Sequence, residues 1–124
     1  METTIEALLE RNLQEVFTSD DAAKRREVIA EIWAEDCVFI GPDGIHRGRK
    51  EIEEAVSDLW ARFPGFRFAG GGPVQAQHGV GRVAWTYGPP DDPRRITGED
   101  IGVIENGKLV TMYTFIDPPR SAGS

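Results

Sequence analysis

Apolar side chains in the first half of the chain repeat at the spacing of amphipathic helices. The first group is Ile5, Leu8, Leu9, Leu13, Val16 and Phe17, and the last is Ile52, Ala55, Val56, Leu59, Trp60 and Phe63. This spacing predicts helices over residues 4–18, 22–35 and 50–62. Pro64 and Gly65 are expected to end the third helix.

Two sets of polar residues bear on how these helices are buried. Asn12 falls on the apolar stripe of the first predicted helix, and a buried amide must find a hydrogen-bond partner. We therefore expect it either to bond within the core or to line a pocket. Lys24, Arg25 and Arg26 form a short basic cluster, which we interpret as a solvated helix face.

The second half of the chain has the pattern of strands separated by turns. Shorter strands are expected at residues 37–40, 45–48, 66–68, 74–78 and 80–87. Asn106-Gly107 lies between two apolar-rich runs and is the strongest short-range hairpin signal, so it predicts a two-residue type I′ turn. Helices that are segregated from a largely antiparallel sheet indicate an α+β fold.

The turn at Asn106-Gly107 fixes a predicted pairing of the two strands beside it. Asp100 would lie opposite Tyr113, on a mostly apolar face that also carries Thr111 and Phe115. A carboxyl group on a covered apolar face loses solvation, which raises its pKa and allows it to donate a hydrogen bond or transfer a proton. Asp100 and Tyr113 are therefore the candidate catalytic residues. The alternative for Asp100 is a structural bond to backbone or to an arginine.

The candidate ligand-contacting residues are mainly aromatic. They are Asn12, Trp33, Phe39, Trp60, Trp85, Tyr87, Thr111 and Phe115. For Trp33, the alternative is packing in the core. No metal site is expected, because His46 and His78 lie 32 positions apart without a further histidine or cysteine at ligand spacing. Cys37 lies in an apolar strand, where an unreactive buried thiol is the expected state.

Composition and charge narrow the classes of function. The 124 residues fit one domain, assigned to 1–118, with a flexible tail at 119–124. A net charge of -7 argues against a nucleic-acid partner or an anionic membrane. A single cysteine excludes an internal disulfide, and the N-terminus lacks the features of a signal peptide. We therefore expect a cytoplasmic protein.

Three segments carry a resemblance to a known family: WAEDCVFIGPDGIHRG, KEIEEAVSDLWARFPGFRF and TGEDIGVIENGKLVTMYTFID. Their order resembles that of the NTF2-like superfamily and is most similar to its SnoaL-like polyketide-cyclase and ketosteroid-isomerase-like branch. The resemblance implies a cystatin-like α+β fold, in which three helices from the N-terminal half close a cone-shaped, curved, mostly antiparallel sheet. It also implies a homodimer formed through the outer face of the sheet.

The resemblance extends to the candidate site. Asp100 matches the strand position from which an acid donates to an oxyanion in ketosteroid isomerases, while Gly41 stands where those enzymes have a general base. Asn12 replaces their first-helix tyrosine. The implied function is binding of a small, largely apolar, carbonyl-containing ligand, with cofactor-independent isomerase, cyclase or lyase/hydratase chemistry at Asp100. The alternative is a non-catalytic module of the same fold that binds a ligand or a protein.

Overall fold

The computed structural model describes residues 4–118, and its helices match the three predicted ones. They are α1 (Ile5–Arg11), which continues directly as the π-helical segment η1 (Asn12–Phe17), α2 (Ala22–Ile32) and α3 (Gly48–Arg62). The Thr4 hydroxyl caps α1, and the Asp21 carboxylate caps α2 by accepting from two backbone N–H groups. The second helix ends earlier than predicted, because the backbone becomes extended at Trp33.

The strands form one mixed, curved sheet. They are β1 (Trp33–Gly41), β2 (Gly44–Arg47), β3 (Arg67–Gly70), β4 (Gln75–Gln77), β5 (Val80–Gly88), β6 (Ile96–Glu105) and β7 (Lys108–Ile116). The strand order is β2-β1-β7-β6-β5-β3, with β4 also paired to β5. All pairs are antiparallel except β1 with β7. The prediction of an α+β fold with a curved, mostly antiparallel sheet and three helices is confirmed.

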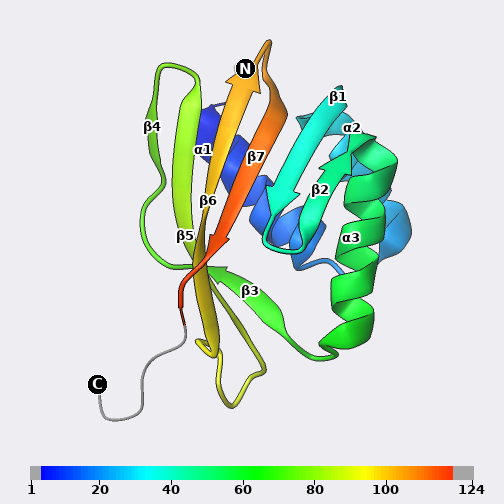
Figure 1. Ribbon diagram of the computed structural model, residues 1–124, viewed down its shortest axis with the longest axis vertical. Helices are drawn as coiled ribbons and strands as arrows, with labels where there is room; N and C mark the ends of the chain where they lie inside the picture. Colours follow the sequence, from blue (N-terminus) through cyan, green and yellow to red (C-terminus); the bar gives the residue numbers. More distant parts are fainter. Residues whose placement is uncertain (1–3, 119–124) are drawn as a thin grey trace.

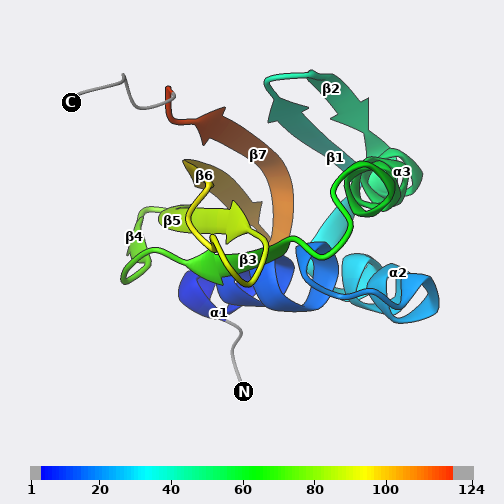
Figure 2. The same ribbon diagram turned by 90° about the horizontal axis from the view of Figure 1, so that it is seen from below.

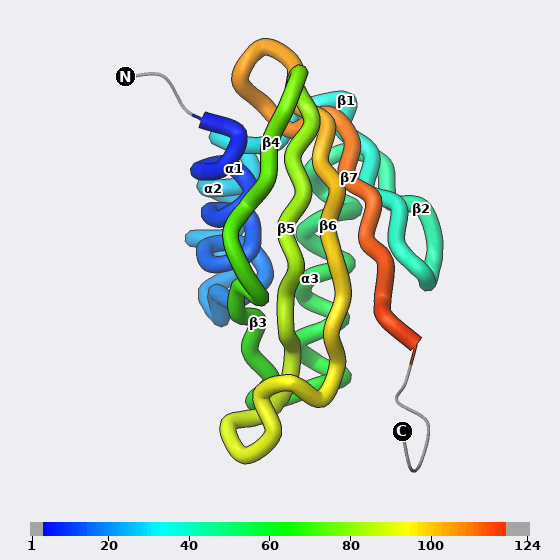
Figure 3. The backbone as a smooth tube through the Cα atoms, turned by 90° about the vertical axis from the view of Figure 1, so that its left-hand side faces the viewer, coloured from blue at the N-terminus to red at the C-terminus, as the bar shows by residue number. Residues whose placement is uncertain are grey.

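The helices lie on one side of the curved sheet. Figure 1 shows the β1–β2 hairpin and α3 beside the longer strands β5, β6 and β7. Seen from below, the sheet bends around a concave side, with α1 against the β5 end and α3 against the β1–β2 end (Figure 2). No helix of residues 4–118 covers the opposite face of β5, β6 and β7, which is turned toward the viewer in Figure 3.

The apolar core fills the space between the helices and the concave side of the sheet. Its most deeply buried members are Leu8, Leu9, Val16, Ile29, Ile32, Trp33, Ile52, Val56, Leu109 and Met112. They come from each helix, from β1 and from β7, so burial of their side chains joins the two halves of the chain into one unit. The periodic apolar residues of the predicted helices account for most of this set.

The β6–β7 hairpin has the predicted turn but not the predicted pairing beyond it. Asn106 and Gly107 both have positive φ (52° and 75°), as a type I′ turn requires, and Glu105 pairs with Lys108. A β-bulge then shifts the register between Val103 and Ile104. A bulge places one additional residue on one strand, so every later side chain of β7 points to the opposite face from the one predicted.

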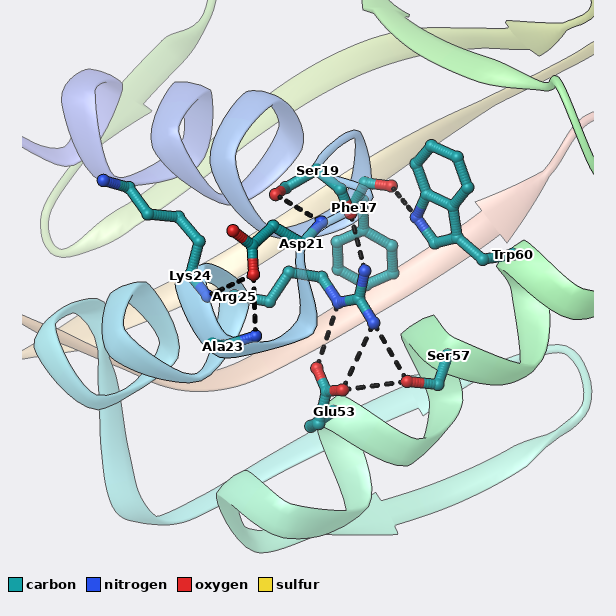
Figure 4. A network of polar contacts seen from close by, with 9 residues as sticks. All are labelled: Phe17, Ser19, Asp21, Ala23, Lys24, Arg25, Glu53, Ser57 and Trp60. Carbon is teal, nitrogen blue, oxygen red and sulfur yellow. Dashed lines mark hydrogen bonds and ion pairs between the residues drawn. The ribbon is translucent and has the colours of Figure 1, made fainter.

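A buried ion pair joins α2 to α3 and contradicts the prediction of a solvated basic face. The Arg25 guanidinium contacts the Glu53 carboxylate at 3.1 and 3.3 Å, the Ser57 hydroxyl at 3.0 Å and the Ser19 carbonyl at 2.7 Å (Figure 4). The Arg25 side chain is only 5% exposed. The other two basic residues of the cluster, Lys24 and Arg26, are exposed as predicted.

The predicted tail at 119–124 lies outside the described residues. Among the helices of residues 4–118, none is long and apolar enough to cross a membrane.

Candidate functional site

A pocket of about 340 Å³ opens on the concave side of the sheet. It is bounded by the β1–β2 hairpin, by α3 and by the inner face of β5, β6 and β7. The lining residues are Phe17, Phe39, Pro42, Asp43, His46, Ala55, Leu59, Arg62, Phe63, Phe68, Trp85, Tyr87, Ile96, Asp100, Thr114 and Ile116. The volume and the mostly apolar lining are typical of a small-molecule site.

Aromatic side chains form one wall of the pocket. The Phe68 ring stacks on that of Tyr87 with centroids 4.0 Å apart, and its edge meets the Trp85 ring at 5.3 Å. Phe17 and Phe39 pack edge to face at 5.7 Å. Burial raises the pKa of Tyr87 to about 12, so its phenol stays protonated at neutral pH. This wall presents rigid apolar surface rather than charge.

Asp100 lies in this wall with its carboxyl group held from one side. The indole N–H of Trp85 donates to Asp100 Oδ1 at 2.9 Å, and the Thr114 hydroxyl donates to the same oxygen at 2.7 Å. Asp100 Oδ2 receives no hydrogen bond from the described residues. Every fully buried side-chain oxygen or nitrogen of the described residues has a hydrogen-bond partner, so Oδ2, which has none, is not fully buried. Asp100 lines the pocket, and Oδ2 is therefore the oxygen available to a ligand there. In the Asp100 carboxyl group, Oδ1 is therefore bonded to the protein, and Oδ2 is free to contact a ligand.

The environment of Asp100 makes its protonated form more stable than that of a carboxyl group in water. Burial is the main cause and raises the pKa of Asp100 from 3.8 to about 6. The hydrogen bonds from Thr114 and Trp85 oppose this rise, and the negative charge of Glu99 adds to it. With two donors on Oδ1, the proton of the acid form belongs on Oδ2, where it can be donated into the pocket.

Two backbone features place these donors beside Asp100. The bulge in the β6–β7 pair puts Thr114, rather than Tyr113, opposite Asp100. Gly98 lies opposite Trp85 on β5, and a Cβ atom at this position would overlap the indole ring and the Phe115 carbonyl oxygen. Gly98 therefore provides the space that the Trp85 ring occupies when it donates to Asp100.

The structure brings four of the predicted site residues together. Asp100, Phe39, Trp85 and Tyr87 all line the pocket. The predicted contact between Asp100 and Tyr113 is wrong, because the bulge turns the Tyr113 side chain to the other face. Tyr113 is 40% exposed there and is no candidate for proton transfer with Asp100.

The other predicted ligand contacts lie in the core or on the outer face. Asn12 accepts a hydrogen bond from the Trp33 indole at 2.9 Å, and both side chains are buried in the core instead of lining the pocket. The Trp60 indole donates to the Phe17 carbonyl oxygen. Thr111 and Phe115 lie on the same strand face as Tyr113, away from Asp100. For Asn12, the alternative of a satisfied core amide is therefore the one observed.

The prediction missed several polar residues at the pocket. Thr114, Asp43, His46 and Arg62 line the pocket, although the sequence pattern did not indicate them as ligand contacts. His46 pairs with Phe39 across the β1–β2 hairpin. The turn residues 41–44 of the sequence could have located His46, since a short loop there puts it directly opposite an apolar strand residue.

The described residues offer no evident metal or thiol chemistry. No group of three or more His, Cys, Asp or Glu side chains in residues 4–118 is placed to hold a metal ion. Cys37 is buried, and burial raises the pKa of its thiol, which keeps it protonated. Asp100 therefore remains the first candidate for chemistry at this pocket.

Comparison with known proteins identifies a family whose model matches most of the chain. Residues 11–112 match the model of the SnoaL-like domain. No curated protein matches the sequence. Among solved structures, a candidate isomerase of the SnoaL-like family from Agrobacterium tumefaciens aligns with a TM-score of 0.84 and 22% identity over 90% of this chain and 95% of that one.

Two more distant structures have the same fold. A SnoaL-like polyketide cyclase candidate from Jannaschia sp. CCS1 aligns with a TM-score of 0.73 and 12% identity, over 94% of this chain and 91% of that one. A protein with a ketosteroid isomerase-like fold from Catenulispora acidiphila, in complex with trimethylamine, aligns with a TM-score of 0.72 and 12% identity over 91% of this chain and 86% of that one. At these identities the likeness shows the fold alone.

Proposed function

The chain belongs to the SnoaL-like domain family of the NTF2-like superfamily, and we propose that it binds a small, largely apolar carbonyl compound in the pocket beside Asp100. Asp100 then acts as the acid or base of a cofactor-independent isomerisation, cyclisation or lyase/hydratase reaction. The observation that carries this proposal is the carboxyl group itself, buried in an aromatic wall with only one of its oxygens bonded to the protein.

The chemistry of such a ligand matches what the pocket offers. Apolar walls bury the ligand's carbon skeleton, and the protonated Asp100 Oδ2 donates to its carbonyl oxygen. When electrons move onto that oxygen during reaction, the same hydrogen bond strengthens, because it then joins a donor to a developing negative charge. The neighbours named as an isomerase and as a polyketide cyclase support a reaction of this class.

Filling the pocket tests whether it is the binding site. Ala55 lines the pocket from α3, so Ala55→Trp is expected to occupy the space and abolish binding of 2-tetralone, an aromatic ketone used as probe. Ala61→Trp is the matched control, because Ala61 is exposed on the same helix. Binding is measured by isothermal titration calorimetry, with circular dichroism to verify that each variant folds. Equal 2-tetralone affinities in both variants would contradict the proposed site.

We also propose that the uncovered outer face of the sheet joins two copies of the chain. Tyr113 and Phe115 are 40% and 58% exposed on this face, beside the partly exposed Ile101 and Val103 of β6. Exposed apolar side chains on adjacent strands favour burial against a partner. A second copy brings the same face, as two-fold assembly requires.

Charge placed on this face is expected to prevent dimer formation. Phe115→Glu would bury a carboxylate in the proposed interface, whereas Ala61→Glu adds the same charge on exposed α3. Light scattering coupled to size exclusion should give twice the chain mass for the native protein and for Ala61→Glu, and the single chain mass for Phe115→Glu. A monomeric native protein at micromolar concentration would rule out the dimer.

A further inference from the structure

The pocket has a second set of polar residues, which come from the β1–β2 hairpin and the end of α3. Besides Asp100 and Thr114, the polar or charged residues that line the pocket are Asp43, His46 and Arg62. Arginine remains charged at every physiological pH and can only donate hydrogen bonds. Asp43 is largely exposed, with a side chain 61% accessible. Imidazole is the side chain best suited to take up and release a proton near neutral pH.

His46 is held in place by contacts on two sides. Its ring stacks on the Phe39 ring with centroids 5.6 Å apart and an angle of 27°, which follows from the pairing of these residues in the β1–β2 ladder. The Asp43 carboxylate lies 3.7 Å from His46 Nε2. The side chain is 23% exposed, so it is partly buried but still accessible from the pocket. These contacts orient the imidazole ring, and neither of them is a short hydrogen bond to a ring nitrogen.

We infer that His46 is a second proton-transfer residue of this pocket, acting on the carbon next to the ligand carbonyl whose oxygen Asp100 contacts. This inference rests on the function proposed above, in which Asp100 is the acid, and it adds His46 as the base. Its geometric support is that both groups line the same pocket from different strands, His46 from β2 and Asp100 from β6. The proposed ligand would contact Asp100 through its carbonyl oxygen and His46 through the neighbouring carbon.

The proton-transfer step balances without a further reactant. Neutral His46 removes a proton from the α-carbon, and the electron pair of the broken C–H bond forms a carbon–carbon double bond. The carbonyl π electrons move onto oxygen, which takes a hydrogen bond or the proton from Asp100 Oδ2. Protonated His46 then returns its proton to the same carbon or to a conjugated one, which gives exchange or isomerisation.

The charged groups around His46 suit this role. Asp43 lies on the turn before β2, and its carboxylate is 3.7 Å from His46 Nε2. Arg62 reaches the pocket from α3 and forms an ion pair with Asp58 at 2.8 Å. On the other side of β2, Glu51 accepts a hydrogen bond from the Arg47 backbone N–H.

Exchange of the α-hydrogens of 2-tetralone in D₂O, followed by proton NMR, measures this step directly. His46→Gln is expected to lower the catalysed exchange rate by about 100-fold or more, while 2-tetralone affinity stays within about threefold. His78→Gln is the matched control, because His78 is exposed in the turn between β4 and β5 and lies outside the pocket lining. It should exchange at the native rate.

The outcomes separate this inference from the function on which it rests. If Asp100→Asn abolishes exchange but His46→Gln keeps the native rate, His46 has no such role and the proposed function of Asp100 stands. If the native protein does not accelerate exchange, both are overturned. A second measurement avoids variants: 2-tetralone should shift the ring NMR signals of His46 and leave those of His78 unchanged. A shift of neither ring would also overturn the role of His46.

Discussion

Replacing Arg25 with alanine is expected to lower the free energy of unfolding by about 3–5 kcal/mol, because the substitution leaves a buried carboxylate without its partner. The Arg25 and Glu53 side chains are 5% and 13% exposed. The guanidinium also bonds to Ser57 of α3 and to the carbonyl of Ser19 before α2 (Figure 4). One side chain therefore connects two helices and the loop that precedes one of them.

The neighbouring arginine supplies the control. Arg26 is exposed on the same helix, so Arg26→Ala should change the free energy of unfolding by less than about 0.5 kcal/mol in the same urea titration. Arg25→Met combined with Glu53→Leu should recover much of the lost stability, since apolar side chains need no ionic partner. Equal effects of the two alanine substitutions would show that the ion pair contributes nothing.

The case of Arg25 illustrates what a one-dimensional pattern leaves out. Three consecutive basic residues predict a solvated face, yet successive helical residues point in directions about 100° apart. Only the position of α3 decides which of them is buried, and that position depends on contacts distant in sequence. Lys24 and Arg26 remain in solvent, while Arg25 meets Glu53, 28 positions away.

The elements were predictable because their signals are local. The apolar stripes of the helices and the Asn106-Gly107 turn each depend on a few neighbouring residues, and all were confirmed. The register of β7 was not predictable in the same way. Residues on both of its faces are largely apolar, so alternation gives no sign of the bulge that exchanges Tyr113 for Thr114.

The pocket was predictable only in part for a related reason. Apolar periodicity identifies side chains that leave water but does not distinguish a filled core from the wall of a pocket. Trp85 and Trp33 carry the same signal, yet Trp85 lines the pocket and Trp33 is completely buried. Asp100 could be identified because burying a carboxylate in an apolar strand costs free energy, which marks the residue as a candidate for function.

That cost leads to an expected result for Asp100→Asn: the variant should be more stable than the native protein above about pH 6, by up to about 3 kcal/mol. Burial raises the pKa of Asp100 from 3.8 to about 6 in the folded protein. Between these values the folded chain keeps a proton that the unfolded chain releases. Stability therefore falls as pH rises from about 4 to about 6 and stays at the lower value above.

Asparagine resembles the protonated acid and does not titrate, so the variant should not lose stability as the pH rises. Its side-chain oxygen can accept from Trp85 and Thr114 as Asp100 Oδ1 does, and its NH₂ group can face the pocket where the acid carries its proton. Urea titrations between pH 4 and pH 8 measure the difference between the two proteins. Glu105→Gln is the control, because Glu105 is exposed at the end of the same strand and should leave the pH dependence unchanged.

The same substitution should remove the chemistry. Asparagine can donate to a carbonyl oxygen but cannot give up or take back a proton, so 2-tetralone should still bind while its catalysed exchange falls by about 10²–10⁴-fold. A gain in stability above pH 6 together with a loss of exchange would mean that the carboxyl group is kept at this position for proton transfer. If Asp100→Asn is instead less stable than the native protein at pH 8, the carboxylate serves the fold, and the pocket must be understood without it.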